Sequence, residues 1–190
     1  MRLLTIATFC VPAILIAGTP SEPNIISKLD ECIQLRFLDG KAFGMLRILP
    51  ASVSGHLTRL FAPENPAEQK VIKQLVEERY EVALYLAGRN PIRGLVQGPA
   101  LITPIEKLDE LPPAAALLPD SRRAFAALEI GGGYSINKGE WTVAMRPLRA
   151  ANERCVQCHI RGAASFGLKV PEPKVGDALG IAMYVYRRNR

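Results

Sequence analysis

The residues best suited to chemistry lie together in the C-terminal part of the chain. Cys155-Val156-Gln157-Cys158-His159 is a C-x-x-C-H motif. In this pattern two thiols can each form a thioether with one of the two vinyl groups of a single haem, and the histidine that follows becomes the proximal ligand of the iron. The spacing therefore predicts one covalently attached haem c, held by Cys155, Cys158 and His159.

The N-terminus predicts export, which agrees with haem attachment because that reaction takes place outside the cytoplasm. Arg2 gives a short positive start, residues 3–16 are mostly apolar, and Ala17 and Gly18 are small. This is the pattern of a secretory signal peptide over residues 1–17. An uncleaved N-terminal anchor is the alternative, although the apolar run is short for a spanning helix. We expect a soluble periplasmic or otherwise exported protein with no stable membrane span after signal removal.

Two other kinds of site use a pair of cysteines at this spacing. A thioredoxin-like redox dithiol would precede a helix within a βαβ unit, and no such pattern surrounds the motif. Half of a zinc site would need two further ligands. After signal removal only Cys32 and His56 remain among Cys and His, and their spacing does not suit a zinc finger. The motif therefore favours haem.

The sixth ligand of the iron stays open at this stage. Cys32 is the third cysteine of the exported chain, and as a thiolate ligand it would pull the iron potential strongly negative. The alternative is a buried structural cysteine, which behaves as a small hydrophobe. His56 is the fallback ligand, and Met45 and Met183 are apolar candidates that suit a core better. An open or water-bound position would favour binding of a small gas.

The elements that must position these residues change character along the chain. Ser27 predicts a helix from Lys28 that places four side chains on one face, namely Leu29, Cys32, Ile33 and Phe37. Asn65 as N-cap and Pro66 at the first helical position predict a second helix. Its apolar stripe runs from Val71 to Leu86, and Gly88 and Pro91 stop it.

The second half of the chain predicts a small sheet. Residues 91–120 are rich in Pro and Gly and suggest loop with one short extended piece. Asp120 or Ser121 would cap a third helix through Leu128. Segments 134–136 and 141–145 read as a β-hairpin turning at 137–139, and 179–186 as a last strand. We expect an α+β fold, with residues 24–190 as one domain: 24–90 mainly helical, 91–190 holding the sheet and the haem-attachment region.

Three segments around the motif resemble the DUF3365 family of periplasmic haem c proteins and sensor domains. They are Ala144-Met145-Arg146-Pro147-Leu148, the C-x-x-C-H motif, and Gly176-Asp177-Ala178-Leu179-Gly180. Arg89-Asn90-Pro91 also matches an element that members often carry. The resemblance implies a PAS-like antiparallel sheet flanked by helices, with one haem c. It also implies that a cysteine on an N-terminal helix, here Cys32, can be the second axial ligand.

Charge gives a weaker indication of partners. The chain has 24 basic and 18 acidic residues, a formal net charge of +6. Arginines bracket the motif, and a guanidinium can bind a haem propionate bidentately, so Arg146 and Arg154 are candidate haem-binding residues. The alternative is an ordinary solvated basic face. No RNA-binding motif or basic patch interleaved with aromatic residues is present, so the basic balance favours an acidic redox partner over nucleic acid.

Three functions compete at the sequence level. The first is electron transfer or redox poise by a mono-haem c-type cytochrome-like protein. The second is a redox or gas sensor that signals through a partner, since no signalling domain follows Tyr186 in the sequence. The third is a haem enzyme such as a peroxidase, for which only His56 could serve as the distal acid–base residue. We expect a haem-binding electron-transfer or sensor protein rather than an enzyme.

Overall fold

The structure, a computed structural model, describes residues 22–39, 44–49, 60–89, 96–129, 133–165 and 172–189. The predicted signal peptide and His56 lie outside these ranges. The elements in chain order are α1 (Asn24–Asp39), η1 (Gly44–Arg47), α2 (Pro66–Glu77), β1 (Tyr80–Gly88), β2 (Val96–Leu101), η3 (Leu108–Glu110), α3 (Ala114–Glu129), β3 (Tyr134–Lys138), β4 (Trp141–Arg149), α4 (Glu153–Ser165) and β5 (Ala178–Arg188).

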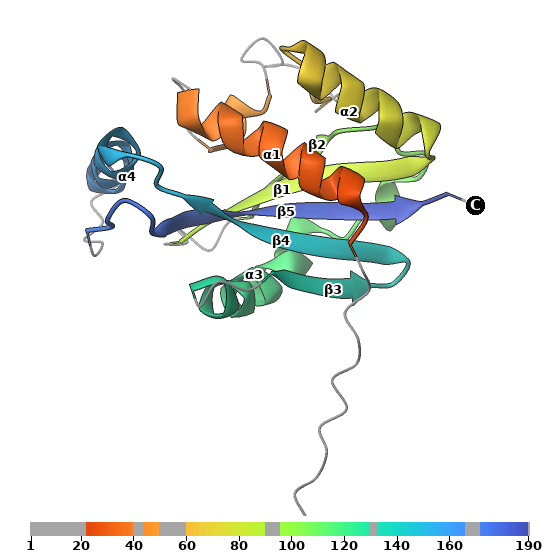
Figure 1. The fold of residues 1–190 in the computed structure, drawn as a ribbon. Coiled ribbons are helices and arrows are strands. Elements are labelled where there is room, and N and C mark those ends of the chain that lie inside the picture. Colours follow the sequence, from red (N-terminus) through yellow and green to blue (C-terminus); the bar gives the residue numbers. More distant parts are fainter. Residues whose placement is uncertain are drawn as a thin grey trace, which may run out of the picture.

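The five strands form one open antiparallel sheet in the order β2-β1-β5-β4-β3. Helices α1 and α2 cover one face of this sheet, α3 covers the other, and α4 lies beyond one end of the strands (Figure 1). The α+β class and the small antiparallel sheet are therefore confirmed.

Two apolar cores lie on either side of the central strand β5. Ala182, Tyr184 and Tyr186 face the core under α1 and α2, whereas Ile181 and Met183 face the core under α3. Because side chains alternate across a strand, a helical layer on each face leaves β5 buried along almost its whole length. The predicted last strand and the predicted hairpin are both confirmed, and β4 continues to Arg149.

The predicted helix through Leu86 is wrong in its second half. Asn65 does cap α2, accepting a hydrogen bond from the Glu68 N–H at 3.0 Å. The helix then ends at Glu77, the chain turns at Arg79 with φ of 61°, and β1 begins. Residues 82–87 are all buried because both faces of β1 are covered. Such a strand shows a continuous apolar run, which i, i+3, i+4 counting mistakes for a helix. The segment 24–90 therefore contains the predicted helices but also strand β1, which was not predicted.

The region 91–120 also differs from the prediction. The short extended piece is β2, as expected, but α3 begins at Ala114 rather than after Asp120 or Ser121. Both of these residues are buried inside the helix. The Ser121 Oγ–H donates to the Leu118 carbonyl, and the Asp120 carboxylate pairs with Lys138 of β3 at 2.7 Å. Pro119 lies within α3, so the density of prolines misled the loop assignment.

Helix α1 starts one turn earlier than predicted, at Asn24 rather than Lys28. Ser27 lies inside it and donates to the Glu22 carboxylate at 3.0 Å. The predicted apolar face is confirmed, because Leu29 and Ile33 are fully buried and Cys32 and Phe37 pack partly buried against the same core.

Candidate functional site

The C-x-x-C-H motif lies on α4, beyond the end of the sheet (Figure 1). The Asn152 side chain accepts a hydrogen bond from the Cys155 N–H at 3.2 Å, as helix-capping residues do. Residues three and four apart are neighbours on a helix surface, so Cys155 lies beside both Cys158 and His159. All three are half-buried, and both thiols are free of disulfide bonds. The helix thus presents two thiols and one imidazole together.

The chain that leads into α4 is fixed to the chain that leads into β5. The Ala150 N–H donates to the Asp177 carbonyl at 2.9 Å, and the Gly176 N–H donates to the Ala150 carbonyl at 2.7 Å. Gly176 has φ of +95°, a conformation that L side chains rarely adopt. These bonds anchor the segment three residues before α4 begins, so they position the motif relative to the sheet.

Gly180 and Asp177 give the Gly-Asp-x-x-Gly segment a structural role. A Cβ on Gly180 would lie 2.9 Å from the Ala87 carbonyl oxygen of β1, too close for any side chain. The Asp177 carboxylate accepts a hydrogen bond from the Lys174 N–H at 3.0 Å, which closes the turn before β5. Part of the family resemblance therefore rests on residues that shape the start of β5.

His159 is half-buried on α4. Burial lowers the pKa of its imidazole below the ordinary value of 6.5, and the positive charge of Arg89 lowers it further. The ring is therefore neutral at neutral pH, which is the form that binds a metal.

Arg89 was not among the predicted site residues, although the sequence contained a signal for it. It follows the last residue of β1, and its N–H donates to the Leu179 carbonyl of β5 at 3.0 Å. Its guanidinium lies 3.7 Å from the Asp177 carboxylate. Arg89 thus meets the Gly-Asp-x-x-Gly segment where Gly88 pairs with Gly180, while Asn90 and Pro91 lie outside the described residues. The match to Arg-Asn-Pro does not by itself place Arg89 at the site, because its contact with Asp177 depends on the pairing of β1 with β5.

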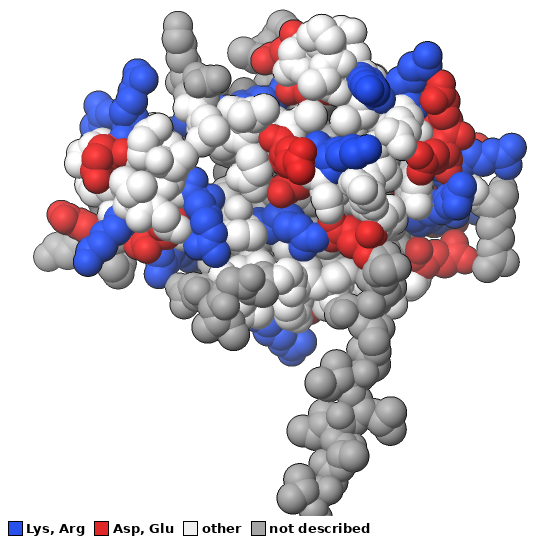
Figure 2. Space-filling model, in the orientation of Figure 1, with Lys and Arg blue, Asp and Glu red and all other residues white. Residues whose placement is uncertain are grey.

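The two predicted haem-binding arginines lie in different surroundings. Arg146 is on β4, where its guanidinium forms an ion pair with Glu22 and also donates to the Met145 carbonyl. Arg154 is on α4 and exposed. Figure 2 shows lysines and arginines interspersed with acidic residues over this face of the molecule, rather than a field of one sign.

Cys32 lies on α1, partly buried against the core that α1 and α2 cover. Burial raises the pKa of its thiol, and the carboxylates of Glu68 and Glu31 raise it further. Within the described ranges, no group of three or more Cys, His, Asp or Glu side chains is arranged to hold a metal ion. The role of Cys32 as sixth ligand stays a prediction, and the fallback His56 is outside the described residues.

The two methionine candidates belong to the cores. Met183 is fully buried on the α3 side of the sheet, and Met45 packs partly buried against the core on the other side. Both positions agree with the expectation that these side chains suit a core better than an iron site.

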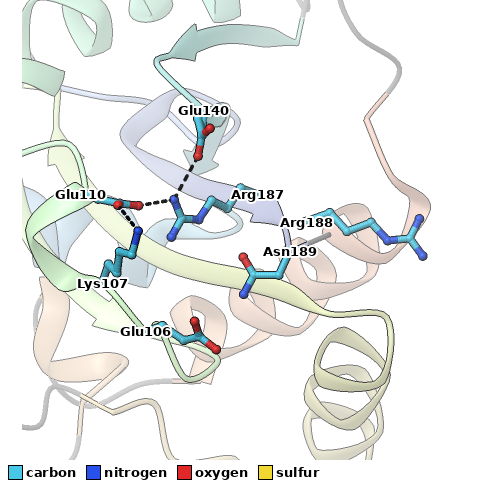
Figure 3. Close-up of a pocket in the computed structure, with 7 residues that line it drawn as sticks. All are labelled: Glu106, Lys107, Glu110, Glu140, Arg187, Arg188 and Asn189. Atoms are coloured by element: carbon cyan, nitrogen blue, oxygen red, sulfur yellow. Dashed lines mark hydrogen bonds and ion pairs between the residues drawn. The ribbon is translucent and has the colours of Figure 1, made fainter.

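A polar hollow of about 530 Å³ lies at the opposite end of the sheet, where β5 ends. Figure 3 shows Arg187 at its centre, bridging Glu110 and Glu140, while Lys107 binds Glu110 from the other side. None of the predicted site residues lines this hollow. Its charged groups largely neutralise one another, so it is distinct from the candidate site.

Comparisons with protein-family models, with curated proteins and with solved structures found no match for this chain. In the part of the chain that the structure describes, no helix combines the length and the apolar character needed to cross a membrane.

Proposed function

We propose that the chain is an exported mono-haem c protein that acts in electron transfer or redox poise. The observation that carries the proposal is the donor set on α4. Cys155 and Cys158 are free and half-buried, so they can be reached, and they lie beside an imidazole that is neutral at neutral pH. A disulfide-bonded pair or a protonated histidine would not suit haem attachment.

These residues fit haem c in both chemistry and arrangement. Each thiol would add to one vinyl group, and His159 would bind the iron through a ring nitrogen. The bound haem would supply a one-electron couple. The chain's own part is to hold the imidazole on a capped helix, anchored to the sheet through Ala150 and Asp177. A geometry fixed in this way suits an electron carrier, which works best when its ligands do not rearrange.

The fold supports the proposal. An antiparallel sheet flanked by helices, with the motif between the last two strands, is what a PAS-like haem c domain would show. The three resembling segments lie on successive parts of the chain. Arg146-Pro147 lies on β4, the C-x-x-C-H motif lies on α4, and Gly176-Asp177 lies in the turn before β5. We infer that these neighbouring segments form one haem site at this end of the sheet.

The partner that suits the proposal is an acidic redox protein. Removal of the predicted signal peptide takes away Arg2 and lowers the formal net charge from +6 to +5, which still favours association with a negatively charged surface. Because surface charges are screened by salt, the rate of electron exchange should fall as ionic strength rises.

Absorption spectra of the purified protein, oxidised and reduced, with and without carbon monoxide, test this function. An electron carrier should show reversible one-electron reduction, and its reduced spectrum should not change with carbon monoxide because both axial positions are filled. Rapid formation of a carbon monoxide complex would instead support the sensor alternative, in which the haem binds a gas.

A further inference from the structure

We propose that Arg89 is a carboxylate-binding residue of the haem site, which holds a haem propionate in exchange for Asp177. This inference rests on the proposed haem c function and names a residue that the motif does not contain. In the present structure, the Asp177 carboxylate would occupy the place that the propionate takes, since the two groups are chemically alike.

The backbone fixes where Arg89 can reach. Gly88 pairs with Gly180 at the end of β1, and the Arg89 N–H extends this ladder by bonding the Leu179 carbonyl at 3.0 Å. Arg89 is therefore held at the end of the sheet beyond which α4 lies (Figure 1). Its side chain is long and remains 38% exposed, so it can turn toward a ligand without moving the strand.

The ion pair that Arg89 makes with Asp177 is suited to exchange. The two groups are 3.7 Å apart, a long contact, and their side chains are 38% and 43% exposed. Exposed ion pairs of this kind contribute little to stability because water solvates both partners. A propionate held close by covalent attachment of its haem would compete with Asp177 at a high effective concentration.

The same region brings Arg89 near the proximal histidine. The Asp177 carbonyl binds the Ala150 N–H, three residues before α4 begins. Arg89 pairs with the side chain of this same Asp177, so it lies close to the segment that leads into α4, the helix that carries His159. Arg89, Asp177 and the helix that carries His159 therefore lie at the same end of the sheet.

The other arginines near the motif are bound elsewhere or lie on α4 itself. Arg146 pairs with Glu22, and Arg149 donates to the carbonyls of Leu128 and Gly176. Arg154 and Arg161 are exposed on α4. Arg146 and Arg89 both pair with a carboxylate from outside α4, but the partner of Arg89, Asp177, lies in the turn whose carbonyl binds Ala150 just before α4.

The charge of Arg89 has a predictable effect on the iron. A cation beside the haem stabilises the reduced state, which carries one positive charge less than the oxidised state. Removal of that cation should therefore favour oxidised iron, and removal of the competing carboxylate should favour reduced iron.

The test uses four variants of the full chain, each matured with covalent haem and titrated for its reduction potential. We expect Arg89→Gln to raise the ratio of oxidised to reduced protein about tenfold at a fixed solution potential, equivalent to about 59 mV for one electron. Arg89→Lys keeps the charge and should change the ratio less than about threefold. Asp177→Asn should shift it in the opposite direction, while its side-chain oxygen can still accept the Lys174 N–H.

Arg188→Gln is the matched control, because it removes one arginine charge at the other end of β5. Arg188 of β5 pairs with Tyr80 of β1. Tyr80 lies eight positions along β1 from Gly88, a distance of about 26 Å. The reduction potential of Arg188→Gln should equal that of the wild type, since this separation exceeds the screening length.

The outcomes separate this inference from the proposed function. Covalent haem in every variant, with equal potentials for Arg89→Gln and Arg188→Gln, would overturn the role of Arg89 and leave the haem site intact. A wild-type protein that matures without covalent haem would overturn both. Opposite shifts for Arg89→Gln and Asp177→Asn would support the exchange.

Discussion

The two ends of the sheet differ in how their charged and reactive side chains are paired and how far they are exposed. Where β5 ends, Arg187 lies 4.3 Å from the centre of the Trp141 ring and binds the carboxylate of Glu81, which is 2% exposed. Glu110 and Glu140 bind the same guanidinium. Where β5 begins, Arg89 and Asp177 form a long and exposed ion pair, and the Asp177 carbonyl binds Ala150 just before α4, the helix that carries two free thiols.

The two ends of β5 therefore suit different roles: the end near Arg187 suits a stabilising role, and the end near α4 suits the binding role that we propose. At the end near Arg187, charged groups satisfy one another, so the network holds the strands together and offers little to a ligand. At the end near α4, the thiols and the imidazole are half-buried, and the ion pair between Arg89 and Asp177 is exposed. A cofactor can reach half-buried groups of this kind.

The sharpest test of this contrast removes the two thiols. The double variant Cys155→Ala, Cys158→Ala should lose covalent haem completely, because no thioether can form on α4. Haem-linked peroxidase staining after denaturing electrophoresis measures the loss. Cys32→Ala is the control and should retain covalent haem, since that thiol lies on α1. Covalent haem in the double variant would break the assignment of the α4 end.

The next effect concerns the sixth ligand. If Cys32 binds the iron as predicted, Cys32→Ala should convert low-spin oxidised haem to high-spin haem and raise the reduction potential, because a thiolate donor is lost. Absorption spectra of the oxidised protein measure the change. Unchanged low-spin bands would remove Cys32 from the iron and leave it as a packing residue of the α1 core.

At the opposite end, Arg187→Leu should lower the free energy of unfolding by about 3 kcal/mol, because Glu81 would remain buried without its partner. Urea unfolding measures the loss, and Arg188→Gln is the exposed control on the same strand. Covalent haem should be retained in both variants. A loss below 1 kcal/mol in Arg187→Leu would show that the network contributes little.

The same variant has a defined pH dependence. Burial raises the pKa of Glu81, but the Glu106 N–H and Arg187 together lower it below the ordinary value of 4.5. A carboxyl group with a lowered pKa stabilises the fold above its unfolded-state pKa, and this contribution is lost as the pH falls through the folded-state value. The difference between wild type and Arg187→Leu should therefore shrink below pH 4.5.

A smaller change in the free energy of unfolding is expected for substitutions in the core under α1, between the two ends of the sheet. The Tyr184 hydroxyl donates to the Asp30 carboxylate at 2.7 Å, which fixes α1 to β5. Tyr184→Phe should lower the free energy of unfolding by about 1–2 kcal/mol. Tyr186→Phe keeps the edge contact between the rings at positions 186 and 80. This variant should change the free energy of unfolding by less than about 0.5 kcal/mol. Equal losses in the two variants would remove the special role of the Asp30 bond.

The sequence allowed prediction of the features that local chemistry dictates. The hairpin of β3 and β4, the last strand and the Asn65 cap were predictable because turn residues, β-rich composition and capping are local signals. Strand β1 was not, because burial on both faces removes the alternation that identifies a strand. The start of α3 was hidden by the prolines before it and within it.

The candidate site shows the same division. The motif on α4 could be read directly from its spacing. Arg89 could not, because it reaches the site through the pairing of β1 with β5, two segments about 90 residues apart in sequence. Contacts of that kind depend on the sheet order, which no local pattern encodes.

A pyridine haemochrome spectrum of the wild-type protein tests whether one haem is covalently attached to α4. The full chain, with residues 1–17 as the predicted leader, should be expressed in a host that has the haem c maturation machinery, then purified and denatured. We expect one haem per chain that stays with the polypeptide after acid–acetone extraction, with the band position of a haem bound by two thioethers. A full-length exported protein from which all haem is extracted would contradict it.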